Sequence, residues 1–403
     1  MLNEGQQKCL EKLIDWWESY DGTKKVFEII GAAGTGKSFI IKYLIESLED
    51  ITMDNVLFVA FVGKAAIQMT RSGVNACTIH SAIYYPVEVS ARDENGKVIK
   101  KEGREVKKIL FKKRDNLDPS IKLIVVDEAA MVDKKLAQDL LSFKIPIIAL
   151  GDKHQLPPIF GDSAFLNHPD FELTEIMRQK AGSSILGLAQ EIINSKYIYL
   201  TPKTVDENLC IIRKKDFFEA GGDKSLLKAD VVICGKNSTR DELNKLIRRL
   251  YLDKMGYDVE HVPELIIGEK IICRKNNWFA QVENINLING LIGYVTDIDP
   301  ESLTSETVKI NFKPDFIKSE FCDLRLNLKY FLGSMQVKNL IKNSNYDRGE
   351  LFELGYAITC HLSQGSQYKK VIVFCERLGD NEYFKKWLYT AVTRASEKLI
   401  VVI

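Results

Sequence analysis

Eight residues near the N-terminus have the types and spacing that hold a phosphate group. The segment follows an apolar run at 26–30 and reads Gly31-Ala32-Ala33-Gly34-Thr35-Gly36-Lys37-Ser38. It matches the pattern G-x-x-x-x-G-K-[ST] in full, in which glycines let backbone N–H groups face an anion. The helix expected after it adds a favourable dipole. We predict that these residues bind a nucleotide, that Lys37 reaches its β- and γ-phosphates, and that Ser38 ligates magnesium.

An acidic pair supplies the other half of a phosphate-transfer site. Asp127 and Glu128 directly follow the apolar run 124–126. Carboxylates at the end of a strand can hold Mg²⁺ through its water shell and polarise an attacking water. The alternative is a solvated acidic turn, which the apolar run before the pair disfavours. We therefore assign Asp127 to the metal and Glu128 to the water, and we predict an enzyme that hydrolyses ATP with Mg²⁺.

Short apolar runs alternate with helical patterns through the first half of the chain. The expected strands cover 26–30, 56–61, 121–126 and 145–150, and the expected helices cover 37–48, 63–71 and 133–141. This alternation favours a parallel sheet with helices on both faces, which binds ligands at the carboxyl ends of its strands. A second region of this kind follows Arg178, with strands expected at 229–234, 371–375 and 399–403. The predicted fold class is α/β.

One insertion is strongly basic. It covers 84–116 and contains the hairpin dipeptide Asn95-Gly96. Its part at 97–114 has nine Lys or Arg against two Glu, a net charge of +7. This charge could neutralise nucleic-acid phosphates, or the insertion could be a solvated charged hairpin. The aromatic residues that could stack on a base there are Tyr84, Tyr85 and Phe111.

A second insertion is rich in strand-like alternation. It covers roughly 262–354 and includes the turn dipeptide Asn289-Gly290. The pattern predicts a small barrel-like domain. Trp278 within it either stacks on a base or anchors the core of the barrel.

Further motifs follow in an order that resembles the superfamily 1 helicases. The string 150–158, LGDKHQLPP, resembles their third motif. The other matching segments are 3–6 (glutamine motif), 60–66 (motif Ia), 78–81 (the next DNA-contact motif), 173–178 (motif IV), 357–365 (motif V) and 389–395 (motif VI). The forms QLPP and TIHS are similar to the 5′-to-3′ branch, which holds RecD-like enzymes and the phage Dda helicase. The set spans nearly the whole chain.

The resemblance implies a domain plan. It predicts two RecA-like P-loop domains with ATP in the cleft between them, a small β-hairpin insertion that carries a strand-separating pin, and an SH3-like β insertion. The corresponding ranges are 1–83 with 117–177 for the first RecA-like domain, 84–116 for the pin, 178–261 with 355–403 for the second RecA-like domain, and 262–354 for the SH3-like insertion.

The resemblance also implies roles for single residues. The catalytic set it implies is Lys37, Asp127, Glu128, Gln155, Arg178 and Arg394, with the two arginines on opposite sides of the cleft. Gln6 would contact adenine, Gln155 would sense the γ-phosphate, and Gln367 would accept a hydrogen bond from the ribose. The DNA contacts it implies are Lys64, Thr78, His80, Thr359, His361 and Ser363.

Four positions depart from the family pattern, and one of them, Gln367, stands where Glu is common in motif V. Phe61 and Val62 stand where Pro and Thr are common in motif Ia, so a hydroxyl contact to DNA is missing there. Leu362 replaces a common Lys in motif V, which removes a charge from strand binding. At the end of an expected strand, Phe61 is a core residue or a stacking face for a base.

Composition bounds the remaining possibilities. The chain has 403 residues, a formal charge of +1, 45% hydrophobic and 28% charged residues, which excludes wholesale disorder. The sequence shows no run of about eighteen apolar residues and no secretory start, so we expect no membrane partner. Its eight cysteines form no CxxC pair and its five histidines have no ligand spacing. We expect reduced thiols and a cytoplasmic protein, or one in the host cytoplasm for a phage protein.

The predicted activity is 5′-to-3′ translocation on single-stranded DNA with separation of duplex, driven by ATP hydrolysis. The expected partners are single-stranded DNA, forked duplex, and single-strand-binding or replication proteins, with a monomer sufficient. Two alternatives stay open. One is an RNA helicase of the same superfamily, and the other is a single-strand-stimulated ATPase that remodels protein–nucleic acid complexes without unwinding.

Overall fold

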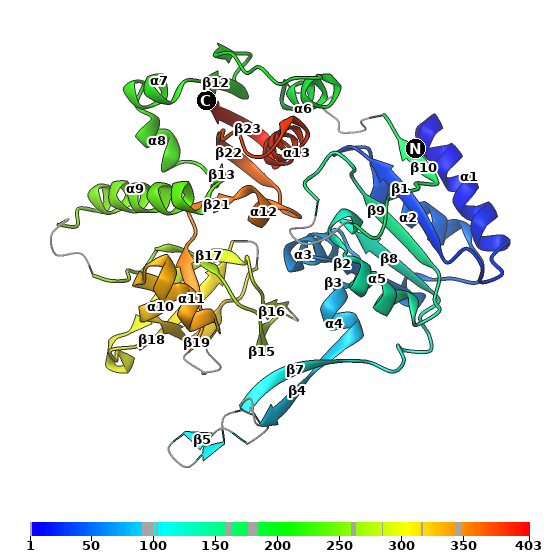
Figure 1. Cartoon of the computed structure of the whole chain (residues 1–403), viewed down its shortest axis with the longest axis horizontal. Helices are drawn as coiled ribbons and strands as arrows, with labels where there is room; N and C mark the ends of the chain where they lie inside the picture. The colour runs from blue at the N-terminus through cyan, green and yellow to red at the C-terminus, as the bar shows by residue number, and fades with distance from the viewer. Residues whose placement is uncertain are drawn as a thin grey trace. The chain divides into compact units, whose positions relative to one another are not determined.

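The computed structural model describes residues 2–90, 98, 100–101, 104–105, 107–157, 163–175, 184–258, 263–283, 285–315, 317–343 and 349–403. It divides into two compact units. Unit 1 joins 1–83, 113–237 and 359–403, and unit 2 joins 84–112 with 238–358. Figure 1 shows the elements of both units.

Unit 1 contains a six-stranded sheet built from the N-terminal part of the chain. Its order is β10 (Phe171–Leu173), β1 (Val26–Gly31), β9 (Ile147–Gly151), β8 (Leu123–Asp127), β2 (Val56–Ala60) and β3 (Ala76–Thr78). Neighbouring strands pair in parallel throughout. Every residue of β9 is buried, which explains why the strands read as continuous apolar runs. This confirms the α/β fold class predicted for the first half of the chain.

Helices pack against this sheet and cover its apolar core. They are α1 (Glu4–Glu18), α2 (Lys37–Ser47), α3 (Gly63–Arg71), α4 (Ile79–Ile83) and α5 (Lys134–Leu141), with the 3₁₀ turns η1 (Met53–Asn55) and η2 (Ala129–Met131). Leu13 of α1, Leu44 of α2 and Met69 of α3 pack in one cluster with Val125 and Leu150 of the sheet. The apolar faces of these helices therefore fix where the loops between strand and helix lie.

A second six-stranded sheet is formed mainly by the C-terminal part of the chain. Its order is β11 (Lys203–Thr204), β12 (Leu209–Ile212), β23 (Ala395–Val402), β22 (Tyr368–Phe374), β13 (Val231–Cys234) and β21 (Ala357–Thr359). The pairs β12–β23, β22–β23 and β13–β22 are parallel. The helices of unit 1 in this region are α6 (Ser184–Asn194), α7 (Lys214–Glu219), α8 (Gly222–Leu226), α12 (Cys360–Ser363) and α13 (Asn381–Val392). The second predicted α/β domain is thus present.

Unit 2 is mainly antiparallel. Its five-stranded sheet has the order β19 (Phe321–Asn327), β18 (Thr307–Pro314), β17 (Ile292–Asp299), β14 (Lys270–Cys273) and β20 (Phe352–Leu354). Two-stranded ribbons are formed by β15 (Asn277–Val282) with β16 (Ile285–Leu287), β4 (Tyr84–Ser90) with β7 (Lys107–Lys113), and β5 (Lys100–Lys101) with β6 (Arg104–Glu105). The remaining elements are α9 (Asn237–Met255), η3 (Pro300–Ser302), α10 (Leu328–Leu332) and α11 (Met335–Asn343). The SH3-like character of this insertion stays a prediction.

A buried charge cluster ties unit 2 together. The Glu353 carboxylate lies 3.1 Å from Arg274 Nε, 3.4 Å from Arg240 Nη1 and 3.3 Å from Lys338 Nζ. The Tyr330 hydroxyl also donates to it at 3.4 Å. These cations outweigh the effect of burial and lower the pKa of Glu353. The cluster links α9, α10 and α11 to the sheet, which explains why α9 groups with the β insertion.

The basic hairpin meets the β insertion within unit 2. The Phe111 and Trp278 rings lie edge to face with centroids 5.6 Å apart. Phe111 nevertheless keeps 49% of its surface exposed. Among the described residues, no helix has the length and apolar character needed to cross a membrane.

Candidate active site

The phosphate loop joins β1 to α2, as its pattern predicts. Gly34 and Gly36 have φ of 87° and 79°, a left-handed conformation that glycine adopts without strain. A Cβ on Gly36 would lie 2.5 Å from Gln6 Nε2, so a larger residue would also clash there. The Lys37 ammonium donates to the carbonyls of Gly31 at 2.7 Å and Ala32 at 3.3 Å. The lysine therefore lies along the inner side of its own loop.

The acidic pair stands at the end of β8. Glu128 has φ of 51°, which is uncommon for a residue other than glycine and is typical of strained functional sites. Its N–H donates to Asp127 Oδ1 at 2.9 Å. Burial raises the pKa of Asp127, and burial followed by the Asp127 charge raises the pKa of Glu128. Lys37 opposes both shifts, because a cation favours the charged carboxylates.

Arg394, between α13 and β23 of the second domain, acts electrostatically on Glu128 of this pair. It is 5% exposed, and its guanidinium donates to Thr390 O at 3.0 Å, Ser366 O at 3.1 Å and Thr393 Oγ1 at 3.3 Å. Its charge lowers the pKa of Glu128 against the effect of burial. Three fixed acceptors therefore hold the guanidinium in one orientation beside the carboxylates.

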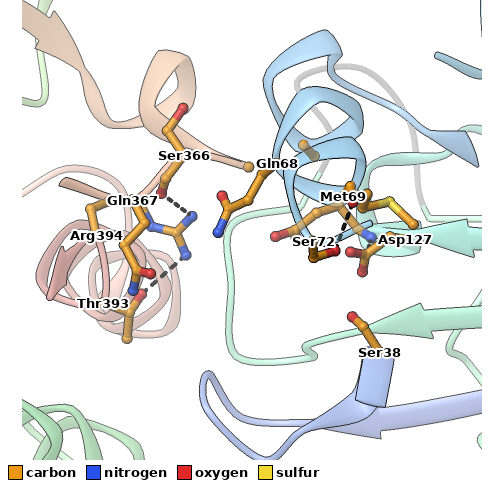
Figure 2. Close-up of a pocket in the computed structure, with 12 residues that line it drawn as sticks. Ser38, Gln68, Met69, Ser72, Asp127, Ser366, Gln367, Thr393 and Arg394 are labelled. Atoms are coloured by element: carbon orange, nitrogen blue, oxygen red, sulfur yellow. Dashed lines mark hydrogen bonds between the residues drawn. The ribbon is translucent and has the colours of Figure 1, made fainter. Parts of the chain in front are cut away.

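Residues of both domains line one cavity of about 310 Å³. Figure 2 shows Ser38 and Asp127 on one side, Gln367, Thr393 and Arg394 on the other, and Gln68 projecting between them. The cavity lining is Ser38, Ala65, Gln68, Met69, Ser72, Asp127, Glu128, Gly365, Ser366, Gln367, Thr393 and Arg394. Seven of these residues were not among the expected site residues: Ala65, Gln68, Met69, Ser72, Gly365, Ser366 and Thr393. The spacing of 65, 68, 69 and 72 is that of one helix face, and this is the signal that could have found the four residues on α3.

The residues present fit a magnesium ion. Mg²⁺ prefers oxygen ligands, keeps several waters, and is usually bound by one or two carboxylates together with substrate phosphates. Ser38 and Asp127 offer a hydroxyl and a carboxylate on the same cavity. In the part of the chain that the structure describes, no three His, Cys, Asp or Glu side chains gather into a protein-only metal site. A site completed by phosphate agrees with both facts.

The loop after β9 is hydrogen-bonded to helices of the second domain. The Leu156 N–H donates to Thr390 Oγ1 at 2.9 Å, and Gln364 Nε2 donates to Leu156 O at 3.0 Å. Gln155 is 6% exposed, and its Oε1 has no hydrogen-bond partner among the described residues. A buried acceptor without a partner is costly and marks a place where a ligand or water completes the bonding.

Gln6 is placed against the phosphate loop. It is 1% exposed, its Nε2 donates to Thr35 O at 3.0 Å, and its Oε1 accepts the Asn3 N–H at 3.1 Å. The Asn3 side chain accepts the Gln6 N–H in return, which completes a capping box at the start of α1. Both ends of the Gln6 amide therefore have protein partners, and contact with adenine stays a prediction.

The six expected DNA-contact residues differ in exposure. Lys64 is buried, with its ammonium 3.3 Å from the Tyr368 hydroxyl. Thr78 Oγ1 accepts the Ser81 N–H and so caps α4. His80 is exposed, and its ring lies edge-on to Phe61 with centroids 6.2 Å apart. Of these three residues, His80 is thus exposed, and Lys64 and Thr78 make polar contacts within the protein.

The other three lie on the segment 359–363. Thr359 and Ser363 are buried, and Ser363 Oγ donates to Cys360 O at 2.7 Å. His361 Nε2 lies 3.4 Å from the Tyr383 hydroxyl, and burial lowers the pKa of its ring. Their contact with DNA stays a prediction. The expected catalytic Arg178 lies outside the described residues.

The turn after α12 meets α3 of the first domain. A Cβ on Gly365, whose φ is 68°, would lie 2.4 Å from Val62 Cγ2 and 3.0 Å from Ala65 Cβ. Glycine is therefore required where motif V approaches motif Ia. This close approach places motif Ia and motif V, two segments predicted to contact DNA, next to each other.

Family models match both ends of this arrangement. An AAA domain model matches residues 20–161, and a UvrD-like helicase C-terminal domain model matches residues 354–402. The two matches cover the phosphate loop with its acidic pair and the segment that carries Gln367 and Arg394.

Relatives match along most of the chain. The ATP-dependent DNA helicase dda of Enterobacteria phage T4 is 26% identical over 68% of this chain, which spans 61% of that relative. The ATP-dependent DNA helicase Pif1 of Campylobacter jejuni is 25% identical, with 96% of this chain and 88% of the relative covered. The ATP-dependent RecD2 DNA helicase of Deinococcus radiodurans is 22% identical over 98% of this chain, which spans 48% of it.

The fold has solved counterparts. A Bacteroides Pif1 bound to single-stranded DNA matches with a TM-score of 0.52 at 17% identity, covering 100% of this chain and 92% of that one. A Pif1 helicase from Candida albicans matches with the same TM-score and identity over 100% and 94%. At this identity the likeness establishes the fold: two RecA-like domains.

The fold and the site define an ATPase of the phosphate-loop class with a nucleotide site between two RecA-like domains. Its ordered motifs, the two family models and its relatives agree on the group. The chain is similar to the superfamily 1 DNA helicases of the Pif1, Dda and RecD type.

Proposed function

We propose that this chain translocates 5′-to-3′ on single-stranded DNA and separates duplex, driven by magnesium-dependent hydrolysis of ATP. The observation that carries the proposal is the composite cavity. Ser38, Asp127 and Glu128 come from the first domain, and Gln367 and Arg394 come from the second. A site divided between two domains lets nucleotide binding and hydrolysis move one domain against the other.

The chain's residues divide the chemistry of phosphoryl transfer. Ser38 and Asp127 hold the magnesium ion, which neutralises phosphate charge when bound. Glu128 accepts a hydrogen bond from the attacking water and orients it. Lys37 and Arg394 stabilise charge on the transferring phosphoryl group from opposite domains, and Arg178 is proposed to join them.

Two contacts support coupling between the nucleotide and the strand. The loop with Gln155 is bonded to Thr390 through Leu156, so a change at the γ-phosphate is passed to the second domain. Gly365 packs on Val62, which joins the segments proposed to hold the strand. We infer an inchworm cycle, in which closing and reopening of the cleft shift the grip of each domain in turn.

The basic hairpin is proposed to separate the strands. Lys112 on strand β7 is exposed and suited to a phosphate, and the Phe111 ring contacts the Trp278 ring. An aromatic side chain there can block reannealing while translocation supplies the work. Opening one base-pair step costs about 1.4 kcal/mol on average. We further propose forked DNA and single-strand-binding or replication proteins as partners, a monomer as the active form, and the cytoplasm as its location.

The first experiment measures ATP turnover with Mg²⁺ alone, with single-stranded DNA and with RNA of the same sequence. We expect turnover that rises at least tenfold with DNA and less with RNA, and that is lost in Lys37→Ala. Equal or greater stimulation by RNA would favour an RNA helicase, since the 2′-hydroxyl is what distinguishes the two strands. Stimulation by DNA without strand displacement would favour a remodelling ATPase.

A further inference from the structure

Tyr389 forms a hydrogen-bonded bridge between the two domains. Its hydroxyl donates to Asp152 Oδ2 at 2.6 Å and accepts the Ala33 N–H at 2.9 Å. Tyr389 and Asp152 are each 1% exposed. The tyrosine belongs to α13 of the second domain, whereas Ala33 and Asp152 belong to the first. The bridge therefore exists only while α13 lies against the phosphate loop.

The bridge has a defined polarity. Burial, followed by the charge of Asp152, raises the pKa of the Tyr389 hydroxyl, so the phenol stays protonated. It must then donate to the carboxylate, and its oxygen remains free to accept from the loop. The other carboxylate oxygen of Asp152 accepts the His154 N–H at 2.9 Å. Hydrogen bonds of a charged acceptor in a buried place are among the stronger ones in proteins.

Arg394 lies just after the C-terminal end of α13. The Tyr389 carbonyl accepts both the Thr393 N–H at 3.1 Å and Thr393 Oγ1 at 2.8 Å. Thr393 Oγ1 in turn accepts from Arg394 Nη2 at 3.3 Å. One chain of bonds thus runs from Ala33 through Tyr389 and Thr393 to the guanidinium.

A second bond fixes the register of this turn. The next residue, Thr390, accepts the Leu156 N–H through Oγ1 and the Arg394 Nε through its carbonyl. Tyr389 and Thr390 are therefore both hydrogen-bonded to the first domain. Thr390 is also bonded directly to Arg394, and Tyr389 is linked to Arg394 through Thr393. A phenylalanine at 389 would fill the same space but would leave the Ala33 N–H and one Asp152 oxygen without this partner.

Resting on the proposed function, we propose that Tyr389 is a positioning residue that couples the phosphate loop to the placement of Arg394. The bridge forms when the two domains close and breaks when they open. While it is formed, it fixes the position of the Arg394 guanidinium relative to the phosphate loop. Tyr389 touches neither phosphate nor water in this account. It acts through Ala33 and Asp152 on one side and through Thr393 on the other.

The test compares Tyr389→Phe with Tyr330→Phe. Tyr330 is the matched control, because it is also 1% exposed and its hydroxyl also donates to a buried carboxylate, that of Glu353, which is not part of the nucleotide site. For Tyr389→Phe we expect ATP turnover at saturating single-stranded DNA to fall about 10- to 100-fold, the effect of losing one hydrogen bond to a charged group. The dissociation constant for ADP should change less than about twofold, because the ligands of the phosphate loop are intact.

A readout independent of turnover follows the bridge itself. Hydrogen exchange of the peptide that contains Ala33 should be faster in nucleotide-free Tyr389→Phe than in the wild type, and unchanged in Tyr330→Phe. In a cycle with Asp152→Asn, the loss in the double variant should be smaller than the product of the single losses, because the two residues act through one bond.

Three results would overturn the inference: turnover of Tyr389→Phe within about twofold of the wild type, unchanged exchange at Ala33, or fully multiplicative losses with Asp152→Asn. An equal loss in Tyr330→Phe would show a general effect of removing a buried hydroxyl and would also overturn it. Wild-type turnover that rises with DNA and is lost in Lys37→Ala is the reference for these comparisons. Its absence would instead refute the proposed function.

Discussion

Replacing Arg394 by alanine removes the one cation that the described part of the second domain brings to the cavity lining. An arginine supplied to a transferring phosphoryl group accounts for about 10³- to 10⁵-fold in rate. At about 1.4 kcal/mol for each factor of ten, this corresponds to a loss of about 4 to 7 kcal/mol of transition-state stabilisation. Three hydrogen bonds between 3.0 and 3.3 Å already hold the guanidinium, so little further conformational entropy is lost when it meets the phosphoryl group. We expect the full range to apply.

The assay is DNA-stimulated ATP turnover, with binding of a fluorescent ADP analogue and thermal unfolding measured beside it. Arg394→Ala should lose at least 10³-fold in kcat, while the affinity for ADP changes far less, since the γ-phosphate is absent from ADP. Arg394→Lys keeps the charge, but its single ammonium nitrogen cannot replace the three guanidinium nitrogens that bond the acceptors, so we expect only partial recovery. The arginine also lowers the pKa of Glu128. Without Arg394 the pKa of Glu128 is higher. In the pH profile of the remaining ATP turnover, the fall on the acidic side should therefore begin at a higher pH.

Two results would refute this reasoning. One is a folded Arg394→Ala protein with turnover within about tenfold of the wild type. The other is an acid limb that moves to lower pH, which would mean that the guanidinium does not act on the Glu128 carboxylate. Either result would show that Arg394 of the second domain does not take part in hydrolysis as proposed.

Three further predictions concern the metal, pH and stability. Removal of Mg²⁺ by EDTA should abolish ATP turnover, and its restoration should recover it; turnover in EDTA would contradict the assignment of Ser38 and Asp127. Burial lowers the pKa of His361 below its usual 6.5, so protonation favours the unfolded state and stability falls as pH drops through 6.5. The Tm of His361→Gln should therefore change less between pH 7.5 and 5.5 than that of the wild type, and equal slopes would count against this. Glu353→Gln should destabilise the protein by about 3 to 5 kcal/mol at pH 7 in denaturant titrations, because three cations lose their buried partner. The pKa of Glu353 is lowered, so this difference should shrink as pH falls below 4.5, and a difference that grows there would be inconsistent with the cluster.

Local chemistry made the first sheet and the phosphate site predictable. The strand expected at 26–30 is β1, and the loop and α2 follow it as the pattern requires. The strand expected at 145–150 begins two residues later, at Ile147, directly after Pro146, which lacks the N–H needed to extend the ladder. Asp127 and Glu128 were found because an apolar strand ends at them. In each case the signal lies within about ten residues.

Contacts between distant segments were not predictable. The bond from Ala33 to Tyr389 spans 356 residues, and that from Lys64 to Tyr368 spans 304. No periodicity records such pairs, so the contact between Lys64 and Tyr368 was not expected. Gln6 is a different case, because Asn3 and Gln6 have the spacing of a capping box, and that local signal was available beside the adenine hypothesis.

The central claim is polarity-specific unwinding, and strand displacement on two partial duplexes tests it most directly. One duplex carries a 5′ single-stranded tail, the other a 3′ tail, and both are incubated with the protein, ATP and Mg²⁺, with Lys37→Ala as the control. The account predicts that only the 5′-tailed duplex opens and that Lys37→Ala opens neither. Opening of only the 3′-tailed duplex would contradict the direction, and opening of neither while DNA stimulates ATP turnover would contradict unwinding itself.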